Sequence, residues 1–375
     1  MTADLQTKAY ETEATLYMAI ELSNEKWRLA FGDGTHKRQV NIAAGDIAAL
    51  SEQISKVKVK WDFAEDVAVV SCYEAGRDGF WLHRQLAELG IVNRVVDAAS
   101  IEVSRRARRA KTDRLDAQAL LEKLIRYEGG ERRVWRVVRV PDPQWEELRQ
   151  LHREREQLLR ERTRHGNRLR GKLVAQGLRV GIGRGFLQRL EEVKLFDGRP
   201  LPEHLKTGLI REWERLQMVQ AQLKALEGEM RELIETNPAL QSVRALMLLS
   251  GVGWVGGWTL VVEILGWREM ANRRELTSLA GLVPSPYNSG NMVRDQGISK
   301  AGNRRVRALL IQLAWLWLRY QPTSKHSCWF QERFGGGSSR QRRIGIVALA
   351  RRLLIDLWRF VETGAVPEGA RLKMS

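Results

Sequence analysis

Two long segments without proline most strongly limit how this chain can fold. Trp145–Val174 and Leu205–Ile234 are highly charged and carry an apolar residue at every third or fourth position. This spacing is typical of long amphipathic helices, so we expect an antiparallel helical pair or a coiled coil, joined through the Gly/Arg-rich segment 177–200. The pair is either a scaffold or dimerisation arm, or an arm that also holds nucleic acid, which the arginine excess of its first helix favours. We expect the arm at 141–238, between domains at 1–140 and 239–375.

The segment before the arm alternates between strand and helix signals. We expect strands at Leu16–Leu22, Trp27–Phe31, Gln39–Ile42, Val67–Cys72 and Ile91–Val96, and helices at Gly45–Val57 and Phe80–Leu89. Val67–Cys72 is a continuous apolar run, which is typical of a strand that is buried on both faces. Three meandering strands followed by strands that helices separate predict a mixed α/β sheet.

The segment after the arm is predicted to be mainly helical, with an irregular loop at Gly281–Asn303 and apolar helices at Val306–Arg319 and Ile344–Phe360. Ala245–Trp267 has the length of a membrane span and carries a single charge, Glu263. Four glycines interrupt it, so we expect two short helices around a tight turn and no membrane partner.

The charge of the chain points to a polyanionic partner. Its 62 Lys and Arg against 45 Asp and Glu give a net charge of +17. The excess lies in two blocks, +10 over residues 101–180 and +11 over 291–375, and the remaining residues sum to −4. Two cysteines, Cys72 and Cys328, cannot form a disulfide framework. The acidic start of the chain is unlike an export signal, so we expect a cytoplasmic protein.

Four carboxylates form the first candidate site. Glu21 ends the first expected strand, and Glu74 follows the buried strand. Asp113 and Asp116 are three residues apart at the start of an expected helix, which directs both to one side. Carboxylates at strand ends can hold two Mg²⁺ ions, which would clamp the attacking and leaving oxygens of a phosphodiester. The adjacent basic run, with Arg105, Arg106, Arg109 and Lys111, supplies charge for a phosphate backbone.

Two further segments are candidate nucleic-acid contacts. Gly251-Val252-Gly253 predicts a tight turn between two helices, and the start of the second helix can bind a phosphate, although a turn that only packs helices explains it equally well. Ser289 precedes a glycine in a proline-bounded loop, and Lys300, Arg304 and Arg305 follow. From composition alone, Ser289 is an ordinary loop serine.

In their order along the chain, these motifs resemble those of a known family. They are the acid of the first strand, YEAGRDGFWLHRQL, AKTDRLDAQAL, the G-V-G turn and LAGLVPSPYNSGNMVRDQGISKAGNRRVRALLIQLAW. Over nearly its whole length the chain resembles the IS-one-ten insertion-sequence transposases, also called DEDD transposases or bridge-RNA-guided recombinases. The family usually has Asp where this chain has Glu21, which lengthens that side chain by one methylene. Asp33, on the adjacent hairpin, is a fallback for this position.

The resemblance implies a RuvC-like (RNase H-type) domain, a coiled-coil arm and a helical transposase domain. Glu21, Glu74, Asp113 and Asp116 would hold Mg²⁺, with Mn²⁺ as a substitute, and Ser289 would be the nucleophile that joins to cleaved DNA. The implied partners are donor and target double-stranded DNA, a guide RNA, and further copies of the chain in a dimer and a tetramer. The implied location is the bacterial nucleoid.

Two other functions fit the residues without the resemblance. A RuvC-like junction nuclease would need the four carboxylates but not Ser289, and a nucleic-acid-binding scaffold would need neither.

Overall fold

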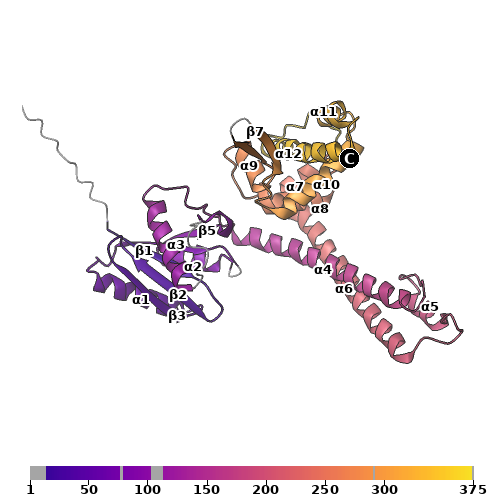
Figure 1. Ribbon diagram of the computed structural model, residues 1–375, viewed down its shortest axis with the longest axis horizontal. Helices are drawn as coiled ribbons and strands as arrows, with labels where there is room; N and C mark the ends of the chain where they lie inside the picture. Colours follow the sequence, from indigo (N-terminus) through magenta and orange to yellow (C-terminus); the bar gives the residue numbers. More distant parts are fainter. Residues whose placement is uncertain (1–13, 77–78, 103–112, 290–291, 374–375) are drawn as a thin grey trace, which may run out of the picture. The chain divides into compact units, whose positions relative to one another are not determined.

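The computed structural model describes residues 14–76, 79–102, 113–289 and 292–373. Within these ranges, only the backbone is described at 99, 113–115, 286–289 and 292–296. The chain divides into two compact units, residues 1–140 and 141–375. Each unit has a sheet and hydrophobic cores of its own, and Figure 1 labels most of the elements.

A five-stranded sheet forms the centre of the first unit, with the strands in the order β3-β2-β1-β4-β5. The strands are β1 (Thr15–Glu21), β2 (Lys26–Gly32), β3 (Lys37–Ala43), β4 (Ala68–Glu74) and β5 (Val92–Val96). β1, β2 and β3 form an antiparallel meander, whereas β4 runs parallel to β1 and β5 runs parallel to β4. The mixed α/β sheet expected from the sequence is confirmed, because each strand begins and ends within two residues of its predicted bounds.

Helices cover both faces of this sheet. On one face, α1 (Ile47–Lys60) and α2 (Trp81–Glu88) share a core with Met18 and Ile20. On the other face, α3 (Asp113–Glu128) shares a core with Ala19 and Cys72. Neighbouring residues of β1 therefore point to opposite cores, as the pleat of a strand requires. A 3-10 turn, η1 (Ala98–Ser100), follows β5.

Two long helices begin the second unit, in the segments where the sequence predicts them. These are α4 (Pro143–Val174) and α6 (Glu203–Thr236), and α5 (Phe186–Glu192) lies in the connection between them. Arg155 pairs with Glu227 and His165 pairs with Glu212, each at 2.8 Å. Because the position along α6 falls as the position along α4 rises, the two helices run antiparallel.

The remainder of the second unit is mainly helical, as expected. Its elements are η2 (Pro238–Leu240), α7 (Gln241–Met247), α8 (Trp254–Leu260), the π-helical turn η3 (Val261–Leu265), α9 (Arg273–Leu279), β6 (Pro284–Ser289), β7 (Met292–Ile298), α10 (Arg304–Tyr320), α11 (Lys325–Phe334) and α12 (Ser339–Thr363). The expectation of an irregular loop at Gly281–Asn303 is wrong, because β6 and β7 form an antiparallel hairpin there. Its proline and glycine content suggested a loop, but a two-stranded hairpin has only edge strands, which tolerate proline.

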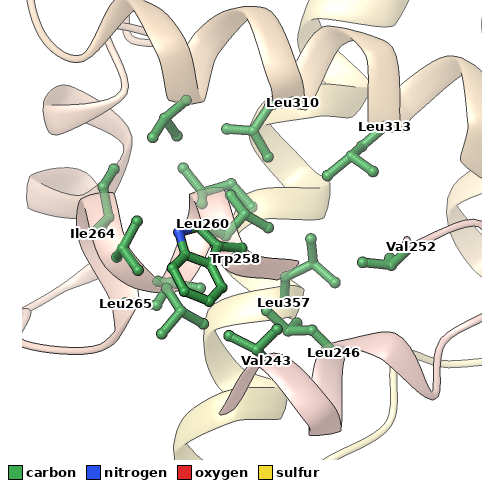
Figure 2. Close-up of a cluster of buried hydrophobic side chains, with 14 of the residues drawn as sticks. Val243, Leu246, Val252, Trp258, Leu260, Ile264, Leu265, Leu310, Leu313 and Leu357 are labelled. Carbon is green, nitrogen blue, oxygen red and sulfur yellow. The ribbon is translucent and has the colours of Figure 1, made fainter. Parts of the chain in front are cut away.

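One core joins the base of the arm to these helices. Figure 2 shows Trp258, which is fully buried, among side chains that include Val243, Leu265 and Leu357. Trp145 near the start of α4 and Ile234 near the end of α6 belong to the same core. None of the described helices has both the length and the apolar character needed to cross a membrane.

Candidate functional site

Glu21 and Glu74 end two neighbouring strands at the same edge of the sheet. β1 and β4 are parallel, and their last registered pair is Ile20 with Tyr73. Glu21 and Glu74 are the next residue on each strand, so the register continues to them. Glu74 is exposed and Glu21 is partly buried.

Both carboxylates belong to the sheet face that α3 covers. Ala19 and Cys72, two residues earlier on each strand, lie in the core beneath α3. Because side chains two apart on a strand share a face, Glu21 and Glu74 lie on the α3 side.

α3 begins near the edge where these strands end. The Cys72 thiol donates to the backbone carbonyl of Leu120 at 3.9 Å, which fixes the middle of the helix. Farther along the helix, Ile125 lies against Gly32, which pairs with Tyr17 near the start of β1. The helix therefore runs antiparallel to β1, with its first turn toward the strand ends.

The two aspartates lie in that first turn. Asp113 is the first residue of α3 and lies four residues before the buried Ala117; Asp116 is partly buried and lies four residues before the buried Leu120. Residues four apart share a helix face, so Asp116 extends the stripe that packs on the sheet. The side chain of Asp113 is outside what the structure describes.

The chemistry of this edge suits a hard divalent cation, since carboxylate oxygens are the ligands that Mg²⁺ takes in proteins. Among the side chains that the structure describes, no three His, Cys, Asp or Glu residues come close enough together to hold a metal ion. The side chain of Asp113 is not among them.

The fallback residue Asp33 does not belong to this edge. It follows Gly32, which pairs with Tyr17 at the far end of β1 from Glu21. Its carboxylate accepts hydrogen bonds from the backbone N–H groups of Thr35 and His36 and from the His36 ring. Burial alone would raise the pKa of Asp33, but these hydrogen bonds outweigh it and lower the pKa. Asp33 shapes its turn.

The four basic residues predicted beside the carboxylates, Arg105, Arg106, Arg109 and Lys111, lie outside the described residues.

Ser289 is the last residue of β6, where the hairpin turns. Its backbone pairs with that of Met292 at the start of β7. The hairpin is held at its other end, where Ser299 donates to the Val283 carbonyl at 2.8 Å and Asn303 donates to the Leu279 carbonyl at 2.7 Å. The side chain of Ser289 is outside the described part of the structure, so the structure fixes its position along the backbone only.

A buried polar cluster lies beside the base of this hairpin. Glu263, on the π-helical turn η3, is 2% exposed. It accepts a hydrogen bond from the Asn303 side chain at 2.6 Å and lies 3.8 Å from the Arg149 guanidinium on α4. Burial, the largest effect, lowers the pKa of Arg149, although the Glu263 carboxylate acts to raise it. Sequence reasoning missed this cluster, although Glu263 was visible as the lone charge of an apolar stretch.

The two arginines that follow Asn303 differ in their surroundings. Arg305 is paired with Glu156 of α4 at 2.7 Å, whereas Arg304 is exposed, like Lys300. Their assignment to nucleic acid remains a prediction, and Arg305 already contributes to the contact with α4.

The glycine turn has a sufficient structural explanation. Gly251 has φ +92°, a region that favours glycine, and a side chain there would contact Tyr320. A side chain at Gly257 would meet Val243 at 3.2 Å, so this glycine allows α7 and α8 to pack closely. Phosphate binding by Gly251 and Gly253 remains a prediction beside this packing role.

Two family models match the chain. One is described as Transposase IS116/IS110/IS902 family and matches residues 243–327; the other, the DEDD transposase model of IS110, matches residues 35–176. The first matched segment contains Ser289. The second contains Glu74, Asp113 and Asp116, and begins after Glu21.

Similar proteins cover nearly the whole chain. The Sinorhizobium fredii protein y4rJ, whose name describes a transposase, is 42% identical over 96% of this chain and 94% of its own length. The transposase for insertion sequence element IS1328 of Yersinia enterocolitica is 23% identical over 84% of this chain and 91% of its own length. The relatives and the two matched models are those of transposases. The chain belongs to the IS110 family of transposases.

Proposed function

We propose that the protein cuts and rejoins donor and target DNA through a covalent phosphoserine bond at Ser289, assisted by Mg²⁺ at Glu21, Glu74, Asp113 and Asp116. One observation carries the proposal: Glu21 and Glu74 end two neighbouring strands, on the sheet face that α3 covers. The first turn of α3 contains both aspartates. The family supports the choice of DNA as substrate. We assign residues 1–140 to a RuvC-like domain, 141–238 to a coiled-coil arm and 239–375 to a transposase domain.

The chemistry proposed for Ser289 is a transesterification. Its hydroxyl loses a proton to solvent, and the serine oxygen bonds to phosphorus. The bond from phosphorus to the neighbouring deoxyribose oxygen breaks, and that oxygen takes a proton from solvent to become a free hydroxyl. A divalent ion bound at the carboxylates would stabilise the negative charge that builds up on the phosphate. Rejoining reverses these bond changes with the hydroxyl of a new strand. The phosphoserine ester conserves the bond energy, so the exchange needs no ATP.

The proposed partners are two DNA duplexes, a guide RNA and further copies of the chain. Each exchange involves several strands, which calls for several copies of Ser289 and so for a dimer and a tetramer. The exposed arginines Arg160 and Arg164 of α4, one turn apart, support a nucleic-acid role for the arm in addition to self-association. Selection of sites through base pairing would let the protein recognise the nucleic-acid backbone alone. A protein with these partners would act at the bacterial nucleoid.

The test is covalent capture. The full chain is incubated with Mg²⁺, the RNA transcribed beside its element and end-labelled donor and target DNA, and then denatured. We expect a protein–DNA adduct that disappears with Ser289→Ala, with Asp113→Ala and with EDTA. Ser285→Ala is the matched control because Ser285 lies on the same strand, and it should leave the adduct intact.

Two results would contradict the proposal. DNA that is cut without an adduct, and still cut by Ser289→Ala, would indicate a nuclease that uses only the carboxylates. An adduct that persists with Asp113→Ala would remove the carboxylate site from the reaction.

A further inference from the structure

A large positively charged groove crosses the second unit beside the base of the β6–β7 hairpin. Its volume is about 1240 Å³, and α9, α10, α11, α12 and the hairpin base line it. Among the described residues that line it are eight Lys or Arg and no Asp or Glu. None of the sites predicted from the sequence includes it, apart from Lys300 at its margin.

One face of α12 supplies the longest wall. Arg340, Arg343, Ile344, Arg351 and Ile355 line the groove; Arg343 and Ile344 are adjacent, and one or two helical turns separate them from the others. This stripe extends for ~22 Å along the helix. The opposite face of α12 is buried in the core of the unit, so the stripe is the face left for a partner.

The facing wall is also positively charged. Arg273 and Arg274 come from the start of α9, Arg307 from α10 and Lys300 from the loop after the hairpin. Among the side chains that the structure describes, none of the groove's eight cations forms an ion pair with a carboxylate. A concave cluster of like charges repels itself until a polyanion enters.

Three isoleucines give the groove an apolar surface, which we call its floor: Ile298 at the hairpin base, Ile311 on α10 and Ile344 on the same α12 face as the arginines. Ile344 is 56% exposed, and Ile298 and Ile311 lie nearby. The Arg352 guanidinium lies 4.3 Å from the centroid of the Trp329 ring, which holds a flat cation against the floor. A duplex keeps its bases stacked inside and presents phosphates, so it offers nothing to an apolar floor.

From this combination we propose that the groove binds an unpaired nucleic-acid strand, with its phosphates on the arginines and its bases against the apolar floor that includes Ile344. Grooves that hold single strands combine these two features. The groove adjoins the proximal end of the hairpin that carries Ser289, so the strand it holds is DNA opened for exchange or RNA that guides it. The choice of ligand rests on the proposed function.

The test measures binding of the full chain in EDTA to three probes of equal length: single-stranded DNA, single-stranded RNA and duplex DNA. Because EDTA prevents metal-dependent cutting, failure of the Ser289 chemistry would not affect the result. Affinity is measured over a range of salt concentrations, since the salt dependence reports the number of phosphate contacts.

The charge test compares two double variants of exposed arginines. Arg340→Gln with Arg343→Gln removes two cations from the groove, and Arg333→Gln with Arg342→Gln removes two outside it. For a single strand, we expect the groove variant to reduce the slope of log K against log salt by about 1.4, from about 0.7 per contact. The control variant should keep the wild-type slope. Equal effects of the two double variants would overturn the proposal.

The floor is tested by Ile344→Ser, with Val174→Ser at the end of α4 as a control of matching exposure, 56% against 55%. Ile344→Ser should weaken single-strand binding several-fold without changing the salt slope, and should leave duplex binding unchanged. The single strand that loses more affinity, DNA or RNA, identifies the natural ligand. If duplex binding weakens as much as single-strand binding, or if Ile344→Ser has no effect, the groove does not hold unpaired bases.

Discussion

The side-chain amide of Asn303 donates a 2.6 Å hydrogen bond to the buried Glu263 carboxylate, while its side-chain oxygen caps the first turn of α10. Asn303 therefore uses both ends of its amide to join the π-helical turn to the base of the Ser289 hairpin. Arg149 of α4 lies 3.8 Å from the same Glu263 oxygen, and the other carboxylate oxygen has no hydrogen-bond partner among the described residues. Glu263 therefore contacts residues from the base of the hairpin and from the arm, within the core of the unit.

Asn303→Asp is predicted to destabilise the second unit. The new side chain keeps an oxygen for the cap but sets a second carboxylate against Glu263. We expect the free energy of unfolding to fall by about 2–4 kcal/mol, because a buried charge loses its donor and gains a like charge.

The partner substitution provides the control. In the double variant Asn303→Asp with Glu263→Gln, the new amide donates to the new carboxylate, so most of the loss should be recovered. Denaturant unfolding of the four proteins gives the coupling energy. Additive losses would contradict a direct link between the two side chains.

Gly302→Ala should cost more stability than Gly297→Ala. Both glycines have positive φ, 120° and 87°, so alanine is strained at either position. A side chain at Gly302 would lie 2.4 Å from the Leu279 carbonyl oxygen, whereas nothing lies within 4 Å of one at Gly297. We expect a loss of ~1–2 kcal/mol at Gly297 and a further ~1–3 kcal/mol at Gly302, measured by denaturant unfolding. Equal losses would show that the hairpin base is not closely packed.

The arm should lose stability in acid through Glu212. Burial acts to raise its pKa, but the His165 hydrogen bond, the charges of Arg168 and His165 and the Arg215 hydrogen bond outweigh burial and lower the pKa below its ordinary 4.5. A lowered carboxyl pKa stabilises the folded state fully above pH 4.5, and that stability is lost as the pH falls through the folded-state pKa.

Glu212→Gln tests this assignment. We expect a loss of about 1–3 kcal/mol at pH 7, since the arginines can turn to solvent, and a loss that shrinks as the pH falls below 4.5. Unfolding is measured between pH 3 and 7, with exposed Glu214→Gln as the control on the same helix. A constant difference across this range would show that Glu212 is not the titrating group.

Glu21 should tolerate aspartate but not glutamine if it binds metal. Glu21→Asp keeps a carboxylate, so Mg²⁺-dependent DNA cutting should persist. Glu21→Gln removes a ligand charge, and cutting should fall more than about 100-fold. Exposed Asp66→Asn is the control for lost charge in the same unit. Equal activity of Glu21→Gln and wild type would exclude Glu21 from the site.

The sequence predicts elements with regular hydrophobic patterns well. The run from Val67 to Cys72 identifies a central strand, and the spacing of apolar residues identifies the long helices α4 and α6. It predicts the Gly281–Asn303 segment poorly, because its prolines and glycines favour a loop and the hairpin pairing is not visible in local composition. The sequence predicts that Glu21 and Glu74 each lie at the end of a strand. That both side chains lie on the same face of the sheet follows only from the observed register of β1 and β4.

The contacts of Glu263 and the charged groove could not be predicted, because each joins residues distant in the chain. Asn303 and Arg149 reach Glu263 from separate helices, and the groove needs Arg273 and Arg343 on facing walls. The one signal in the sequence was Glu263, the lone charge in an apolar stretch. It indicates that a polar partner is buried beside it but does not show which residue that is.

The nucleophilic role of Ser289 is tested most directly by locating the residue that carries the DNA. The denatured adduct is digested with nuclease and trypsin, and mass spectrometry is applied to the peptide Glu275–Arg294, which contains Ser278, Ser285 and Ser289. We expect the nucleotide remnant on Ser289. A remnant on another residue, or cut DNA with no remnant on the protein, would contradict it.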